Sequence, residues 1–307
     1  MIEFKTSALA LLVLLLPACG SDSEIVTDPG PDASEGGLDA SGQDAGPDSG
    51  ADTGDVDAST DARPDADVES DATQEAGASQ APVTLGASSP FAILASAQVT
   101  NIPTSSITGD VGLTPDAGAN ISGFTSPITC PEVTGHVYAV DATGPACALI
   151  DPVLLASAKS DAESAFLDAR AAARGTPASI SGDLNGLTLY PGLYESLTSV
   201  EISAGGILYL DAQGDANAVF ILRSETSITT EAASQVVLAG GAKAANVYWT
   251  AGSSVTLGTT STMKGTLIAG TSISLLTGAH LEGRALNQGA AAEAVTLDQS
   301  TITVPSP

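Results

Sequence analysis

The chain has 307 residues, of which 9 are Lys or Arg and 36 are Asp or Glu, so its formal net charge is −27. This acidic balance excludes an ordinary nucleic-acid-binding domain, which needs a basic face, and argues against electrostatic docking on an anionic bilayer. With two His, three Cys and 4% aromatic residues, the chain offers little material for metal sites, His-based catalysis or aromatic stacking platforms.

The amino terminus has the features of an export signal. Lys5 precedes an apolar run, residues 8–16, that is too short to span a bilayer and suits the core of a signal peptide. The following Pro17-Ala18-Cys19-Gly20 resembles a bacterial lipoprotein box, although Pro17 departs from the usual residue there. We predict a signal peptide over residues 1–18 and a lipid on Cys19, which would anchor the protein to the outer membrane or cell surface. Ordinary signal cleavage, with secretion, is the alternative.

An acidic segment follows the signal. Residues 21–80 hold 17 acidic residues against a single base, Arg63, together with many small residues and no aromatic one. Such a composition cannot bury enough apolar surface to offset the chain entropy, and like charges extend it. We therefore predict a disordered tether over residues 19–80. Specific calcium binding is a weaker alternative, because the Asp spacing lacks the D-x-[DN]-x-[DN]-G pattern of a calcium loop.

One helix is predicted at about 152–174. Asp151 is a suitable N-cap and Pro152 occupies the first helical position. The apolar residues at helical spacing are Leu154, Leu155, Ala158, Ala162, Ala165, Phe166 and Ala169. Arg170 and Arg174 would complement the dipole at the carboxyl end of the helix. The stripe is narrow and rich in Ala, which predicts that the helix lies flush against a flat surface.

The rest of the chain from residue 83 consists of short β-branched runs separated by small residues, and it repeats itself loosely. Similar units begin at Asn246, Gly265 and Gly283, which are 19 and 18 residues apart. A period near this length, made of three short strands, suggests a parallel β-solenoid, in which each turn of the chain forms one rung. Strand alternation then places six aliphatic side chains inside the solenoid: Val255, Leu257, Ile273, Leu275, Val295 and Leu297. It places four hydroxyl side chains on the outer surface, stacked in one column: Thr229, Thr256, Ser274 and Thr296.

Cys130 and Cys147 are predicted to form a disulfide, which is the usual state of paired cysteines in an exported protein. Closing a loop of that size contributes about 3 kcal/mol by the chain-entropy relation. A metal or redox role is disfavoured, because the chain has no CxxC pair and only His136 lies nearby in sequence.

Several stretches occur in a distinctive order: Ile107-Thr108-Gly109-Asp110-Val111-Gly112, Tyr190-Pro191-Gly192-Leu193-Tyr194, Asn246-Val247-Tyr248-Trp249 and Gly283-Arg284-Ala285-Leu286. Their order and spacing resemble the ice-binding proteins of the irregular β-solenoid family. The resemblance implies a mostly β fold over residues 81–307: a discontinuous right-handed parallel β-solenoid of triangular cross-section, with one long α-helix packed alongside. It also implies that the first strands return to pair among the later rungs, and that residues 127–150 form a capping insertion pinned by the disulfide.

In that family one flat solenoid face binds ice, so the resemblance implies an ice surface as the partner. The candidate face comprises Ser227, Thr229, Ser254, Thr256, Ser272, Ser274 and Thr296, with Thr259, Thr262 and Thr277 at the adjoining edge. Some members have a Thr-[Ala/Gly]-x-[Thr/Asn] motif at this edge. Residues 259–262 fit it in part, and residues 277–280 have His280 in its last place.

The predicted function is ice binding, which would inhibit crystal growth or recrystallisation or attach the cell to ice. A cell-surface adhesin or structural module of the same fold is the alternative. A carbohydrate-active enzyme is disfavoured, because the candidate rungs offer only Lys264, Glu282 and Arg284, and the chain has no G-x-S-x-G or HExxH motif. We expect no catalytic residues, cofactor, metal site or nucleic-acid partner, and we expect a monomer.

Overall fold

The computed structural model describes residues 79–289 and 293–306. The predicted signal peptide, Cys19 and the predicted tether up to residue 78 lie outside the described residues. The described chain begins in contact with the domain, because the Gln80 side-chain amide donates to the Arg174 carbonyl at 3.2 Å. The Arg174 guanidinium donates to the Ala81 carbonyl at 2.7 Å. These two hydrogen bonds hold residues 80 and 81 against the segment that follows the helix.

Parallel strands form three faces around one core. The eight-stranded face contains, in spatial order, β10 (Gly182–Asp183), β13 (Val200–Ile202), β16 (Ile228–Thr230), β19 (Val255–Leu257), β21 (Ile273–Leu275), β23 (Ala294–Asp298), β2 (Gln98–Ile102) and β5 (Ile121–Ser122). The helix-covered face contains β8 (Leu149–Ile150), β7 (Val137–Ala139), β4 (Asp110–Leu113), β1 (Phe91–Ala95), β22 (His280–Asn287), β20 (Thr262–Ala269), β18 (Val247–Ala251), β15 (Phe220–Ser224), β12 (Gly192–Ser196) and β9 (Ala178–Ser179). The third face is, like the eight-stranded face, not covered by the helix, and we call it the second open face. It contains β11 (Thr188–Leu189), β14 (Ile207–Asp211), β17 (Gln235–Ala239), the first residues of β20 and β22, β24 (Thr301–Thr303), β3 (Ser106–Thr108) and β6 (Val133–Thr134).

Strands β20 and β22 turn the corner between the second open face and the helix-covered face. Gly265 and Gly283 are register partners at this corner. A Cβ atom on Gly283 would lie 1.8 Å from the Gly265 carbonyl oxygen, so the corner requires glycine. We expected three short strands per rung. In these two rungs there is instead one strand of three residues, β19 or β21, and one strand of eight residues, β20 or β22, which belongs to two faces.

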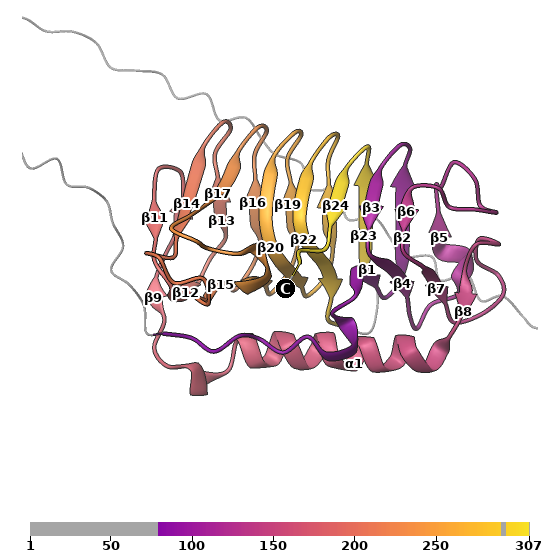
Figure 1. The fold of residues 1–307 in the computed structure, drawn as a ribbon, viewed down its shortest axis with the longest axis horizontal. Helices are drawn as coiled ribbons and strands as arrows, with labels where there is room; N and C mark the ends of the chain where they lie inside the picture. Colours follow the sequence, from indigo (N-terminus) through magenta and orange to yellow (C-terminus); the bar gives the residue numbers. More distant parts are fainter. Residues whose placement is uncertain (1–78, 290–292, 307) are drawn as a thin grey trace, which may run out of the picture. The chain divides into compact units, whose positions relative to one another are not determined.

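The first strands of the domain return to pair among the last, as expected. β1 pairs with β22, β2 with β23, and β3 with β24. Figure 1 shows this arrangement, with the indigo amino-terminal strands beside the yellow carboxy-terminal ones. The Arg284 guanidinium reinforces it by donating to the Ser89 carbonyl at 2.8 Å, just before β1 begins.

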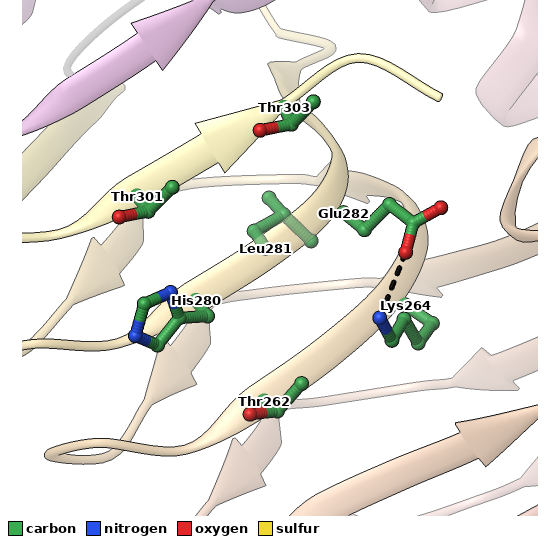
Figure 2. A pocket seen from close by; sticks show the side chains of 7 residues that line it. All are labelled: Thr262, Lys264, His280, Leu281, Glu282, Thr301 and Thr303. Carbon is green, nitrogen blue, oxygen red and sulfur yellow. Dashed lines mark hydrogen bonds and ion pairs between the residues drawn. The ribbon is translucent and has the colours of Figure 1, made fainter. Parts of the chain in front are cut away.

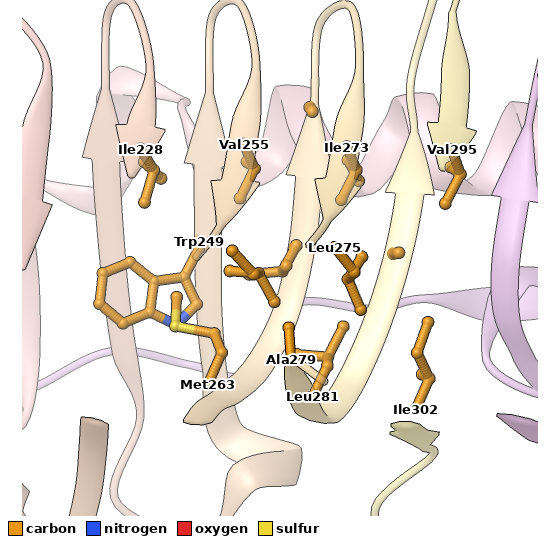
Figure 3. Close-up of a cluster of buried hydrophobic side chains, with 14 of the residues drawn as sticks. Ile228, Trp249, Val255, Met263, Ile273, Leu275, Ala279, Leu281, Val295 and Ile302 are labelled. Atoms are coloured by element: carbon orange, nitrogen blue, oxygen red, sulfur yellow. The ribbon is translucent and has the colours of Figure 1, made fainter. Parts of the chain in front are cut away.

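Side chains from all three faces meet in the core (Figure 3). The contributing residues include Ile228, Val255, Ile273 and Val295 from the eight-stranded face, Met263, Leu281 and Ile302 from the second open face, and Trp249 from the helix-covered face. All are at most 2% exposed, and the whole predicted inward set is buried. Burial of this apolar surface is the main term that stabilises the solenoid.

Helix α1 (Pro152–Ala169) lies alongside the stacked rungs (Figure 1). The Asp151 side chain caps it by accepting a hydrogen bond from the Leu154 N–H at 2.9 Å. Its Ala-rich stripe is buried against the sheet, as predicted. The short 3₁₀ helices are η1 (Gly86–Ser88), η2 (Gly118–Asn120), η3 (Ala172–Arg174) and η4 (Ala244–Asn246). Within the described ranges, no helix is long and apolar enough to cross a membrane.

The predicted extension of the helix to residue 174 was wrong. The Arg170 guanidinium instead donates to the Ser224 carbonyl at 3.1 Å. The Arg223 guanidinium donates to the Ala169 carbonyl at 2.7 Å and to the Ala171 carbonyl at 3.2 Å, and so satisfies the groups that a further helical turn would have used. The helix therefore ends where the sheet supplies its cap.

Cys130 and Cys147 form the predicted disulfide, which joins residues 17 apart in sequence. The expected capping insertion also extends the solenoid, because it contains β6, β7 and β8. Close to the disulfide, the Thr125 N–H donates to the buried Glu132 carboxylate at 2.6 Å. Burial raises the pKa of Glu132, but the hydrogen bonds from Thr125 outweigh that effect and the pKa is lowered overall.

Candidate functional site

The eight-stranded face carries one outward column of small hydroxyl residues. In strand order the outward residues are Asp183, Glu201, Thr229, Thr256, Ser274, Thr296, Thr100 and Ser122, each paired in register with the next. The predicted neighbours Thr229, Thr256, Ser274 and Thr296 are thus adjacent, as the repeat indicated. We call the run Thr229, Thr256, Ser274, Thr296, Thr100 and Ser122 the hydroxyl column.

Thr100 and Ser122 were missed by sequence reasoning. They lie on β2 and β5, which precede the helix, whereas the repeat was found only after it. A signal was present, because residues 98–100 have the same alternation as residues 294–296, with which they pair. The returning strands therefore lengthen the column beyond its predicted end.

Further hydroxyl residues accompany the column. Ser227, Ser254 and Ser272, the predicted neighbours of the column, each directly precede a strand, lie two residues before a column residue and are half-buried. A row at the turns was missed: the Ser253 N–H donates to the Thr226 carbonyl at 2.7 Å, and the Thr271 N–H donates to the Ser253 carbonyl at 2.9 Å. These rows repeat about 4.7–4.9 Å apart between strands and about 6.6 Å apart along each strand.

The column is uncharged and held firmly. Thr256, for example, lies between Val255 and Leu257, which are both fully buried. The Thr296 hydroxyl donates to the Ser274 hydroxyl at 3.1 Å and joins two neighbouring members. Because the inward neighbours fix the backbone, little conformational entropy remains to be lost when a surface docks on the column.

The adjoining edge differs in part from the prediction. Thr259 and Thr277 are exposed in the turns that leave the eight-stranded face, and the Thr277 hydroxyl donates to the Asp298 carboxylate. Thr262, however, begins β20 and pairs with Gln235 and His280 on the second open face. The predicted site therefore divides between two faces, and His280 does not interrupt the hydroxyl column.

The second open face is uneven. It contains an open hollow of about 350 Å³ lined by Thr262, Lys264, His280, Leu281, Glu282, Thr301 and Thr303 (Figure 2). The Lys264 ammonium and the Glu282 carboxylate form an ion pair at 2.7 Å across neighbouring strands. Long charged side chains and a hollow make this face less suited to a flat, neutral surface than the hydroxyl column.

Comparisons with known proteins agree with one another. The model of the ice-binding-like family matches residues 93–303. An ice-binding protein of Flavobacterium frigoris (strain PS1) is 36% identical over 226 residues, which cover 73% of this chain and 76% of the relative. An ice-binding protein of a Colwellia species is 34% identical, with 73% of this chain and 84% of the relative covered.

Solved structures give the same result. A crystal structure of an ice-binding protein from an Antarctic biological consortium is 39% identical with a TM-score of 0.64, and the match covers 74% of this chain and 93% of that one. A domain of the Shewanella frigidimarina ice-binding protein_1 is 28% identical with a TM-score of 0.67, covering 75% of this chain and all of that one. This chain shares its fold with these solved structures. Together with the match to the family model, this similarity shows that the chain belongs to the ice-binding-like family.

Proposed function

We propose that the protein binds ice through the hydroxyl column and the serines beside it. The observation that carries the proposal is a regular, uncharged row of Thr and Ser on a rigid sheet, in a chain whose relatives are ice-binding proteins. Neighbouring strands place these residues about 4.7–4.9 Å apart, which is close to a lattice repeat of ice. Threonine presents a methyl and a hydroxyl together, so the face can both exclude loose water and hydrogen-bond to ordered water.

Adsorption would inhibit crystal growth or recrystallisation, or hold the cell to ice. We place the binding residues Ser227, Thr229, Ser254, Thr256, Ser272, Ser274, Thr296, Thr100 and Ser122 on the face, with Thr259 and Thr277 at its edge. The proposal includes no catalytic step and no cofactor. It also treats the protein as a monomer, because one face of one chain supplies the whole contact.

The test is an ice recrystallisation assay on the purified protein at micromolar concentration. Slowed grain growth and faceted crystals support ice binding. Ordinary grain growth at that concentration would contradict it and favour an adhesin or structural module of the same fold.

We further propose that the protein is exported and lipid-anchored through Cys19, with residues 19–80 as a tether that lets the domain reach ice beyond the membrane. The support is the signal-like run before Cys19 and the acidic composition after it. Mass spectrometry of the mature protein should find an acylated Cys19 at its amino terminus. A free amino terminus at another residue would contradict the anchor and indicate secretion.

A further inference from the structure

The hydroxyl column ends abruptly in acidic residues on one side. Glu201 on β13 pairs in register with Thr229, and Asp183 on the edge strand β10 pairs in register with Glu201. Both carboxylate side chains are on exposed residues. The same backbone geometry therefore continues for two strands beyond Thr229 with side chains of a different chemical class.

A carboxylate is a poor partner for ice. It must give up mobile hydration when a surface docks on it, and a charge that loses its hydration without a counter-charge is strongly disfavoured. Water molecules fixed in a lattice cannot reorient around the ion. The Glu201 side chain is also longer than a Thr side chain, so at this position it would hold the ice plane away from Thr229.

The two acids differ in their structural roles. The Asp183 carboxylate accepts hydrogen bonds from the N–H groups of Asn185 and Ser203, both at 3.0 Å. Burial raises the pKa of Asp183, but these hydrogen bonds lower it further than burial raises it, so the carboxylate is kept ionised. Asp183 also protects the exposed edge strand, a usual role of charge at a sheet edge. The Glu201 carboxylate makes no hydrogen bond or ion pair within residues 79–289 and 293–306.

We propose that Glu201 sets the length of the ice-contacting column, and that Glu201→Thr extends it by one strand. This inference rests on the proposed ice-binding function. The replacement completes a run of small hydroxyl residues from β13 to β5 and leaves Asp183 to protect the edge. It also removes the repulsion between two like charges in register, so the fold loses nothing by the change.

The experiment compares the full mature protein with its Glu201→Thr and Glu201→Ser variants in the recrystallisation assay. The matched control is Glu282→Thr, which makes the same chemical change on a strand of the second open face and alters the net charge equally. We expect Glu201→Thr to lower the concentration for half-maximal inhibition about threefold, because one preorganised contact is added. Glu201→Ser should change activity in the same direction, and Glu282→Thr should leave it unchanged. The melting temperatures of the two Glu201 variants should stay at or above that of the parent, whereas Glu282→Thr should lower it slightly, because it breaks the surface ion pair with Lys264.

Unchanged activity in Glu201→Thr with an unaltered melting temperature would overturn the inference. An equal gain in Glu282→Thr would also overturn it, since the gain would then follow net charge rather than position. The proposed function is tested separately. An inactive parent protein would overturn both the proposed ice binding and the inference about Glu201. If the parent is active and Thr256→Tyr inactivates it, the proposed function stands and the Glu201 variants decide the inference alone.

Discussion

Ile273→Ala tests whether the face is held by the core beneath it. Ile273 is fully buried between Val255 and Val295, its register partners on the eight-stranded face. The substitution removes three carbons at about 0.8 kcal/mol each and leaves a cavity, so we expect a loss of about 3–4 kcal/mol in the free energy of unfolding. For a domain of this size, the melting temperature should fall by about 10 °C.

The assay is thermal and urea denaturation followed by circular dichroism, with Ser272→Ala as the control. Ser272 directly precedes Ile273 but is half-exposed, so its substitution should change stability by no more than about 0.5 kcal/mol. A loss below about 1 kcal/mol for Ile273→Ala, or an equal loss for both variants, would refute the assignment of inward and outward residues.

Three further predictions concern what holds the solenoid to its helix and its cap. Arg223→Met should lower the free energy of unfolding by about 2–3 kcal/mol, because it leaves the Ala169 and Ala171 carbonyls at the end of the helix without this donor. The control is Lys243→Met, at an exposed position without an ion pair in the described residues. It should be nearly neutral in the same denaturation assay. Reduction of the Cys130–Cys147 disulfide should cost about 3 kcal/mol, measured as a shift of the urea midpoint in reductant; no shift would contradict the cap's role. The folded pKa of Glu132 lies below its unfolded value of 4.5, so the stability it contributes is present above about pH 4.5 and is lost as the pH falls through the folded pKa. The gap in melting temperature between the parent and Glu132→Gln should therefore narrow from pH 7 to about pH 3, and a constant gap would contradict this sign.

Much of the fold follows from local patterns. The period after Asn246 predicted the stacking of Thr256 on Ser274, because those rungs have nearly equal lengths. The rung from Thr229 to Thr256 is longer, since it also contains β17 and η4, yet the same four-residue pattern identified its strand.

Other features depend on contacts that a local pattern does not contain. Thr100 joins the column only because β2 inserts beside β23, far away in sequence. The helix stops at Ala169 because Arg223, on a distant strand, caps it. Thr262 lies on the second open face because the chain turns a corner at residues 258–261, which strand alternation alone does not reveal.

The most direct test of the account compares Thr256→Tyr with Thr303→Tyr in the recrystallisation assay. Thr256 lies within the hydroxyl column, and Thr303 is an exposed strand residue on the second open face. A tyrosine on a flat contact surface holds the opposing plane away, and because both side chains point outward from their strands, neither substitution enters the core. We predict that Thr256→Tyr loses ice activity, that Thr303→Tyr keeps it, and that both melt within a few degrees of the parent protein. Retained activity in Thr256→Tyr together with lost activity in Thr303→Tyr would contradict the account and assign ice binding to the second open face.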